Sequence, residues 1–300
     1  MTRTSSVIST TVKLAFMAGI VAAALNYQQL LDQYALATYH PAPDVASIES
    51  RIGLTDYARG VFYRTDPQVA SKSAFNTDCE TTRGELELGC YYRNSIYILH
   101  IDNQSLAPEM DVVTAHELLH AAWARLSSDE KTKLTSQLEQ AFTSLADADL
   151  RDRMAQYAQS EPGQQANELH SILGTEYVTL PPELEAYYAR YFTSRAQIVA
   201  AHEKYQTVFT TRKAELENQL ATIRNLKAQL NVVNRQLESY RSSGNIPAYN
   251  SLVPKQNSLV DGINTRIDNY QSGVDEYNAL SKSLDSQLIT DTEAGVGASH

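Results

Sequence analysis

The sequence predicts an α+β protein: a small domain with a short antiparallel sheet and a buried helix, followed by a long antiparallel coiled-coil hairpin of α-helices. Three observations predict this fold. Residues 84–101 are rich in Ile and Tyr and alternate as a β-hairpin does. Apolar residues recur at helical spacing on both sides of that stretch. About sixty residues after Pro182 contain neither Gly nor Pro, which is typical of a long helix.

Composition and charge exclude several classes of protein. With 300 residues, 43% of them hydrophobic, and only 12 Gly and 9 Pro, the chain is too apolar for a disordered or fibrous protein. The net charge is −10, and no run of like charge is longer than three residues, so there is no electrostatic footprint for nucleic acid. We therefore expect one or two packed domains and no nucleic-acid partner.

The N-terminus carries an apolar segment that suits export. Residues 14–25 are all apolar, and Arg3 and Lys13 precede them in an acid-free stretch. Twelve residues fit the core of a signal peptide, whereas a membrane span needs about 20. If the segment is counted from Val7, it has nineteen residues, so an uncleaved membrane anchor is an alternative. A buried core helix is a further alternative. We assign residues 1–37 to a signal peptide or N-terminal membrane anchor, which makes the rest extracytoplasmic, either secreted or held at the membrane.

The two cysteines agree with an exported protein. Cys79 and Cys90 are close in sequence, and an even count at close spacing in an exported chain indicates a disulfide. Closing so short a loop stabilises the fold by roughly 3 kcal/mol in the chain-entropy model. The alternative is two free thiols in a reducing compartment.

Residues 38–180 form the expected small domain. Helical patterns at about 44–52 and 54–64 precede the β-hairpin, whose turn is Arg93-Asn94. Pro108, followed by Glu109 and Asp111, indicates the first turn of a helix that continues to about residue 126. A capping box at residues 127–130 starts a helix to about residue 147, and a further helix covers roughly 164–178.

Residues 181–290 form the expected coiled coil, and residues 291–300 a disordered tail. Apolar positions step by 3 and 4 along a first helix, a polar loop at residues 242–247 interrupts it, and a second helix repeats the pattern. An intramolecular hairpin is the preferred interpretation, with pairing between two chains or with a helical partner as the alternative. The predicted seam consists of Leu216, Leu220, Ile223, Leu226, Leu230, Val233, Leu237 and Tyr240, and on return Leu259, Ile263, Ile267, Tyr270, Val274, Tyr277, Leu284 and Leu288.

The motif H-E-x-x-H at residues 116–120 indicates a metal site. On an α-helix, His116 and His120 lie one turn apart, so their imidazoles converge on one point, as two ligands of tetrahedral Zn²⁺ do. Glu117 lies beside them and can reach a water on the metal without binding it. This arrangement predicts hydrolysis by a metal-activated water with Glu117 as general base. The alternative is a histidine pair that only satisfies hydrogen bonds in the core.

The third ligand is expected on the later helix, where Glu168, His170 and Glu176 are available. At this point the chain resembles the zincin metallopeptidases, in the branch in which a glutamate on a later helix completes the site. The later helix of that branch often reads N-E-x-x-[SA]-[DE], and residues 167–171 match it. The resemblance implies that Glu168 is the ligand. Ile172 stands where the pattern has an acidic residue, which leaves Glu176 or His170 as alternatives.

The same resemblance, over about residues 75–180, implies two further roles. In zincins the strand before the metal helix is commonly a sheet edge that pairs with an extended peptide, and here Ser95, Tyr97 and Leu99 occupy that strand. A Tyr or His commonly stabilises the oxyanion, and the candidates are Tyr157, Tyr177 and His170. We expect His202 on the long helix to be an ordinary polar residue.

Together these features predict an exported zinc metallopeptidase that acts on a peptide or protein substrate. The wider sequence frame around both motifs also resembles a family of exported bacterial proteins. The competing hypothesis is a non-catalytic envelope protein in which the coiled coil carries the function and the zincin core is a retained scaffold. A site that binds zinc only for folding is a third hypothesis, but such a site is closed by four protein ligands and needs no base such as Glu117.

Overall fold

The computed structural model describes residues 27–79 and 88–285. The apolar segment 14–25, the start of the expected β-hairpin at 84–87, Leu288 and the tail 291–300 lie outside the described residues. The chain divides into two compact units. The first, which we call the N-terminal unit, runs through His100 and resumes from Pro108 to His202. The second, the hairpin unit, comprises residues 101–107 and continues from Glu203.

The N-terminal unit begins with helices α2 (Tyr27–Thr38), α3 (Pro43–Ile52) and α4 (Asp56–Tyr63). The sequence predicted α3 and α4. Helix α2 overlaps the predicted signal or anchor segment, residues 1–37, and it packs against α4. Its buried Asp32 pairs with Arg125 at 2.9 Å and with Arg64 at 3.4 Å. Because a buried carboxylate with two arginine partners belongs to a folded core, the boundary at residue 37 is corrected: residues 27–37 are part of the N-terminal unit.

A small mixed sheet follows. It has the order β1-β3-β2, with β1 (Gln68–Ala70) parallel and β2 (Gly89–Tyr92) antiparallel to β3 (Ser95–Leu99). The predicted hairpin is confirmed over the described residues: Arg93 and Asn94 have φ of 50° and 65°, the left-handed backbone of a tight two-residue turn. The sheet is not purely antiparallel, however, because β1 adds a parallel strand that the sequence did not predict.

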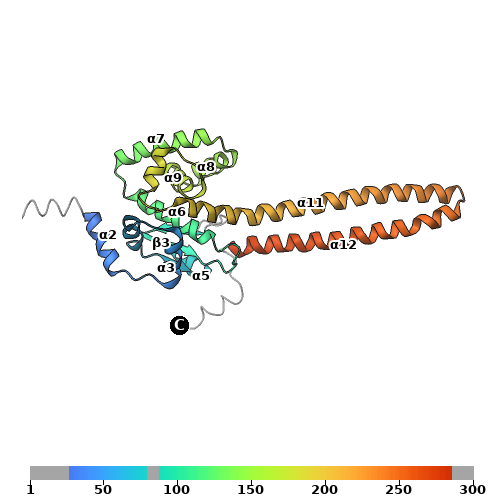
Figure 1. Ribbon diagram of the computed structural model, residues 1–300, viewed down its shortest axis with the longest axis horizontal. Helices are drawn as coiled ribbons and strands as arrows, with labels where there is room; N and C mark the ends of the chain where they lie inside the picture. Colours follow the sequence, from blue (N-terminus) through green and yellow to red (C-terminus); the bar gives the residue numbers. More distant parts are fainter. Residues whose placement is uncertain (1–26, 80–87, 286–300) are drawn as a thin grey trace, which may run out of the picture. The chain divides into compact units, whose positions relative to one another are not determined.

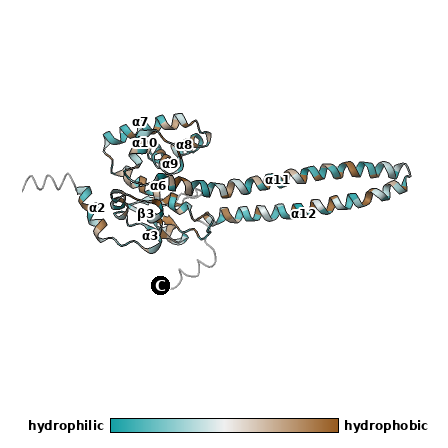
Figure 2. Ribbon diagram, viewed as in Figure 1, coloured by the Kyte–Doolittle hydropathy of each residue, from teal (hydrophilic) through white to brown (hydrophobic). Residues whose placement is uncertain are grey.

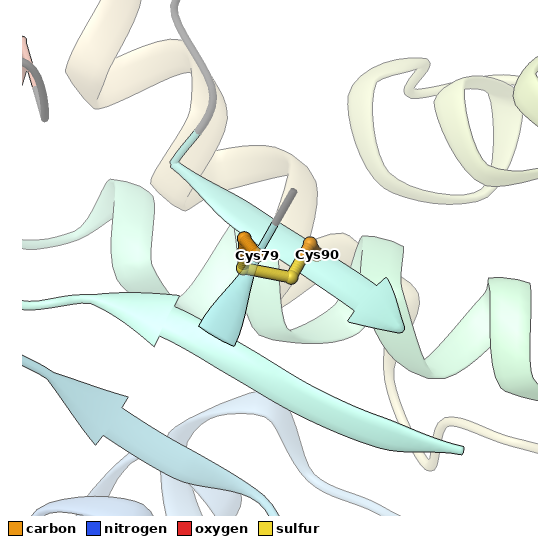
Figure 3. Close-up of a disulfide and its surroundings, with 2 residues drawn as sticks. All are labelled: Cys79 and Cys90. Carbon is orange, nitrogen blue, oxygen red and sulfur yellow. A yellow bond between two sulfur atoms is a disulfide. The ribbon is translucent and has the colours of Figure 1, made fainter. Parts of the chain in front are cut away.

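Helix α5 (Lys72–Asp78) connects the first strand to the predicted disulfide. Cys79 and Cys90 are bonded, with their Cα atoms 6.2 Å apart, and the bond joins the end of α5 to strand β2 (Figure 3). The expected disulfide is therefore confirmed.

The rest of the N-terminal unit is helical. Helix α6 (Glu109–Ala124) contacts the sheet through β2 and β3 and also packs against α9. The predicted capping box is present, because Ser127 and Glu130 cap each other's backbone at the start of α7. The sequence did not predict α8 or α10. The remaining helices are α7 (Ser128–Leu145), α8 (Ala148–Ser160), α9 (Gln165–Glu176) and α10 (Pro182–Tyr188).

The hairpin unit contains two long helices that run antiparallel, α11 (Arg195–Ser242) and α12 (Ile246–Leu284), as Figure 1 shows. The first turns of α11, up to His202, belong to the N-terminal unit. The predicted intramolecular hairpin is what the structure shows: Arg212 pairs with Glu276 at 2.9 Å, and Gln256 donates to Asn234 at 2.8 Å. Apolar and polar residues are interspersed along the whole length of both helices (Figure 2).

Two predicted seam residues, Ile267 and Val274, are misplaced by the prediction. Ile267 is 39% exposed, whereas its neighbour Ile263 is 5% exposed and faces α11. The first-helix positions Ile223, Val233 and Leu237 are buried as expected. Ile267, together with Val274 seven residues later, therefore belongs to a different stripe of α12 from the one that α11 covers.

The expectation of a transmembrane segment is corrected. Across residues 27–79 and 88–285, none of the helices has both the length and the apolar character that a bilayer crossing requires. The apolar segment on which that expectation rested lies outside this part of the chain.

Candidate metal centre

Two histidines on α6 form one side of the site. His116 and His120 are one helical turn apart, and their ring centroids are 4.7 Å from each other. Helix α6 is buried along most of its length, with Ala115, Leu118 and Leu119 fully covered. The helix therefore holds both imidazoles on a rigid, packed element, as the sequence predicted.

Glu168 on α9 completes the cluster. Its Oε2 lies 3.6 Å from His116 Nε2, and its Oε1 lies 3.4 Å from His120 Nε2. The candidate ligand atoms of the three residues all lie within 4.8 Å of one another. Two ligands on one tetrahedral zinc ion, each about 2.1 Å from it, are about 3.4 Å apart. The donor set and its spacing therefore fit a divalent metal, and Glu168 is the residue that the structure brings to the two histidines.

The charge of Glu168 suits a ligand. Its side chain is 9% exposed, and burial alone would raise the pKa of the carboxyl. The neighbouring imidazoles of His116 and His120 outweigh burial and hold the pKa below its usual value. Glu168 is therefore an anionic carboxylate at neutral pH, as a metal ligand must be.

A buried hydroxyl supports one of the histidines. Ser171 Oγ lies 3.4 Å from His120 Nδ1, the ring nitrogen that faces away from Glu168. A histidine ligand usually has such a partner on its second nitrogen, which fixes the ring's orientation and tautomer. The zincin pattern has an acidic residue for this support at the position of Ile172, which here is fully buried and apolar. Ser171, one residue earlier, supplies it.

Glu117 lies against the edge of the sheet. Only 7% of the residue is exposed, and its side chain packs on Gly89 of β2. A Cβ at position 89 would lie 3.1 Å from Glu117 Oε1 and would also collide with Val113 Cγ1, so only glycine leaves this space free. The carboxylate is thus held between α6 and β2, directly after His116 in sequence and on the wall of the same cleft as both histidines.

The cleft that contains the cluster has a volume of about 940 Å³. One wall is the edge strand β2, another is α6, and the third comes from α8 and α9. Helix α8 was not predicted from the sequence, so Arg153 on this helix was not among the predicted site residues. Arg153 makes a bidentate pair with Glu176, at 2.6 and 2.9 Å, and all of these residues line the cleft.

This pairing engages Glu176, one of the alternative third ligands. Glu176 is bound to Arg153, and the guanidinium holds the pKa of Glu176 below its usual value even though burial alone would raise it. The cluster of possible ligands contains Glu168 and not Glu176. The Arg153 contact fixes Glu176 as one partner of a structural ion pair.

His170 is also placed elsewhere. It is fully buried among the rings of Trp123, Tyr187 and Tyr188, with centroids 5.4 to 5.6 Å away, and burial lowers its pKa well below the usual value. Neither ring nitrogen has a hydrogen-bond partner within the described part of the chain. Since His170 does not line the described cleft, its alternative roles as ligand and as oxyanion donor are corrected.

Of the two tyrosine candidates, one lies at the site. Tyr157 lines the cleft, and burial, with a smaller contribution from Glu168, raises the pKa of its hydroxyl to about 12, so it remains a proton donor. Tyr177 donates to Asp147 at 2.9 Å and does not line the described cleft. Its proposed role at the oxyanion is therefore corrected.

The expected substrate strand is corrected as well. Ser95, Tyr97 and Leu99 belong to β3, which is the central strand and is hydrogen-bonded on both sides. Such a strand has no edge to offer to a peptide. Among the described strands the outer ones are β1 and β2, and β2 lines the cleft.

The structure also brings together residues to which the sequence analysis gave no role. His202 lies 3.6 Å from Glu176 and 3.8 Å from Glu109, so it joins a polar cluster and is not an isolated surface residue. Glu109 lies seven residues before His116, on the same face of α6. That spacing was visible in the sequence and would have placed Glu109 on the wall of the cleft.

Comparisons with known proteins identify no relative. No protein-family model matches the chain, and no curated protein or solved structure matches it. The likeness to zincins therefore depends on the motif residues alone.

Proposed function

We propose that this chain is a zinc-dependent metallopeptidase that hydrolyses peptide bonds in the cleft between β2, α6 and α8. The observation that carries the proposal is the convergence of His116, His120 and Glu168, with Glu117 on the wall of the same cleft. Three protein ligands with an adjacent carboxylate are typical of a catalytic zinc site, whereas a structural zinc site has four.

Each residue has a distinct task in this proposal. His116, His120 and Glu168 hold the ion, and Ser171 orients the ring of His120. Zinc, when bound, polarises a carbonyl and lowers the pKa of a water. Glu117 accepts the proton from the attacking water and returns it to the leaving amine. Tyr157 remains protonated and donates to the oxyanion that develops on the substrate.

Strand β2 is the proposed substrate-binding edge. It is an outer strand of the described sheet and lines the cleft through Gly89 and Tyr91. An extended peptide can add to such an edge through main-chain hydrogen bonds, which require little sequence specificity. The disulfide at Cys90 anchors this strand and supports an oxidising, extracytoplasmic compartment for the protein.

The test is Glu117→Gln, compared with Glu168→Ala and with Glu139→Gln on the exposed face of α7. We expect Glu117→Gln to bind zinc as tightly as wild type and to lose turnover by at least about 100-fold, because the base is lost and the ligands are kept. Glu168→Ala should lose zinc, and Glu139→Gln should behave as wild type. The measurements are zinc content of the purified protein and cleavage of a fluorogenic peptide library.

Two outcomes contradict the proposal. If Glu117→Gln cleaves the library as fast as wild type, Glu117 is not the base. If wild type binds stoichiometric zinc but cleaves no peptide, the competing hypothesis of a non-catalytic protein with a retained scaffold replaces this one.

A further inference from the structure

Helix α12 is built from five consecutive heptads of one pattern. From residue 246 they read IPAYNSL, VPKQNSL, VDGINTR, IDNYQSG and VDEYNAL. The first position of each heptad is β-branched and the fifth is an amide. Residues at these positions are neighbours on a helix surface, so they form one continuous stripe, which we call the Val–Asn face. It consists of Ile246, Val253, Val260, Ile267 and Val274, and of Asn250, Asn257, Asn264, Gln271 and Asn278.

The other helix of the hairpin covers a different stripe. Helix α11 contacts the fourth and seventh heptad positions: Gly273 approaches Leu216, and Tyr277 packs on Phe209 with ring centroids 5.8 Å apart. Three apolar residues of the Val–Asn face are exposed, Ile246 at 56%, Val260 at 37% and Ile267 at 39%, while Val253 and Val274 are half-buried. An apolar surface three heptad positions wide is typical of a bundle of more than two helices, whereas a two-stranded coil needs only two.

We propose that the Val–Asn face is the dimer interface of this protein and that its occupant is the same face of a second copy. The chain carries a net charge of −10, so two copies repel each other least when uncharged faces meet. None of the ten residues of the face is charged. Amides donate and accept hydrogen bonds, so a row of Asn and Gln is complementary to itself, as a two-fold interface requires.

The charges beside the face set the direction of the second copy. Residues 246–260 contain no acidic residue and one base, Lys255. Residues 261–276 contain Asp261, Asp268, Asp275 and Glu276 against one Arg266. A parallel dimer would place the two acidic halves together. An antiparallel dimer, with its two-fold axis near Val260, places each acidic half beside an acid-free one and pairs Val253 with Ile267 of the second copy.

The first test measures association of the full chain by sedimentation equilibrium. Wild type should be a dimer. The double variant Val260→Asn/Ile267→Asn should raise the dissociation constant by at least about 100-fold, because four buried apolar side chains are lost per dimer. The matched control Ser258→Asn/Thr265→Asn changes two exposed residues on the opposite face of α12 and should leave the constant unchanged. Circular dichroism must show unaltered helix content in both variants.

The second test determines the direction by cysteine crosslinking. The two native cysteines are bonded to each other, so an introduced thiol has no competitor. A mixture of Val253→Cys and Ile267→Cys chains should give the mixed disulfide on oxidation, identified by mass, whereas a parallel dimer gives only the two homodimers. A monomeric wild type, or a dimer that Val260→Asn/Ile267→Asn leaves intact, overturns the proposal. Crosslinked homodimers alone overturn the antiparallel arrangement.

Discussion

At the scale of single residues, the contact that supports His120 differs from the one in the zincin pattern, which this chain resembles only in its motif residues. Ile172 removes the acidic partner that the pattern provides, and the hydroxyl of Ser171 takes its place at 3.4 Å from His120 Nδ1. A hydroxyl is a weaker acceptor than a carboxylate, so the imidazole should be a less basic ligand. If the cluster binds zinc as proposed, a hydroxyl in place of a carboxylate lowers the zinc affinity and leaves the set of ligands the same.

The prediction from this contact is that Ser171→Ala lowers zinc affinity by about 10-fold, the low end for loss of an outer partner. Zinc affinity is measured by competition with a chromophoric chelator. The matched control is Thr175→Ala, since Thr175 is an equally buried hydroxyl on α9 that donates only to the carbonyl of Ser171. Equal losses in both variants would show that packing of α9, and not the contact to His120, sets the affinity.

At the scale of elements, the approach of α9 to α6 depends on one glycine. A Cβ at Gly174 would lie 2.5 Å from Leu119 Cδ1 and 2.7 Å from Tyr188 Cε1. Such contacts are too short for carbon atoms, so any larger residue would push α9 away from α6. Because Glu168 is on α9 and both histidines are on α6, this close packing also sets the distance between the ligands.

Helix α8 depends on its N-cap, and this gives a pH-dependent prediction. Asp147 accepts from Leu150 N at 3.1 Å, and this bond, followed by the one from Tyr177, lowers the pKa of the carboxyl. A carboxyl with a lowered folded pKa contributes stability above its unfolded pKa of about 3.9 and loses it as the pH falls through the folded value. Asp147→Ala should therefore cost about 1 kcal/mol at neutral pH and progressively less below about pH 4.

Urea unfolding at several pH values, with Asp152→Ala on the exposed face of α8 as control, measures this cost. The control should be within about 0.5 kcal/mol of wild type at every pH, as is usual for exposed surface positions. A cost for Asp147→Ala that stays constant with pH would show that the cap contributes without its charge.

The elements also show how far the sequence could predict the site. Periodicity located α6, α9 and both long helices, and the H-E-x-x-H spacing placed His116 and His120 together, because these are properties of one local segment. The sheet order was not predictable: β1 is a three-residue strand, and its pairing with Tyr97 and Leu99 is long-range. Helix α8 was missed although Asp147 is a good cap, because its apolar stripe contains only Leu150 and Met154 as buried residues.

At the scale of the whole molecule, the candidate metal centre belongs to one unit. All three ligands and the residues of the described cleft come from the N-terminal unit, and the hairpin unit supplies none of them. The two functions proposed here, hydrolysis and dimerisation, are therefore separable by changes to the chain.

We predict that removing two heptads from each arm of the hairpin, residues 228–241 and 248–261, leaves zinc affinity and cleavage of short peptides unchanged. The deletion keeps the heptad phase, so the seam between α11 and α12 closes again. Both quantities are measured as for the point variants. A rise in cleavage of short peptides would show instead that the hairpin restricts access to the cleft, and a loss of zinc would show that the units are not independent.

The ligands come from two helices that are about fifty residues apart in sequence, and this has a thermodynamic consequence. An ion held by His116, His120 and Glu168 would act as a crosslink between α6 and α9. The unfolded chain does not hold these groups together, so a bound ion adds RT ln(1 + [L]/Kd) to the free energy of unfolding, where [L] is the concentration of free metal ion. This is about 2.7 kcal/mol when that concentration is 100 times Kd. A chain secreted into a zinc-poor environment would thus be both inactive and more easily degraded, so metal supply would govern its lifetime as well as its chemistry.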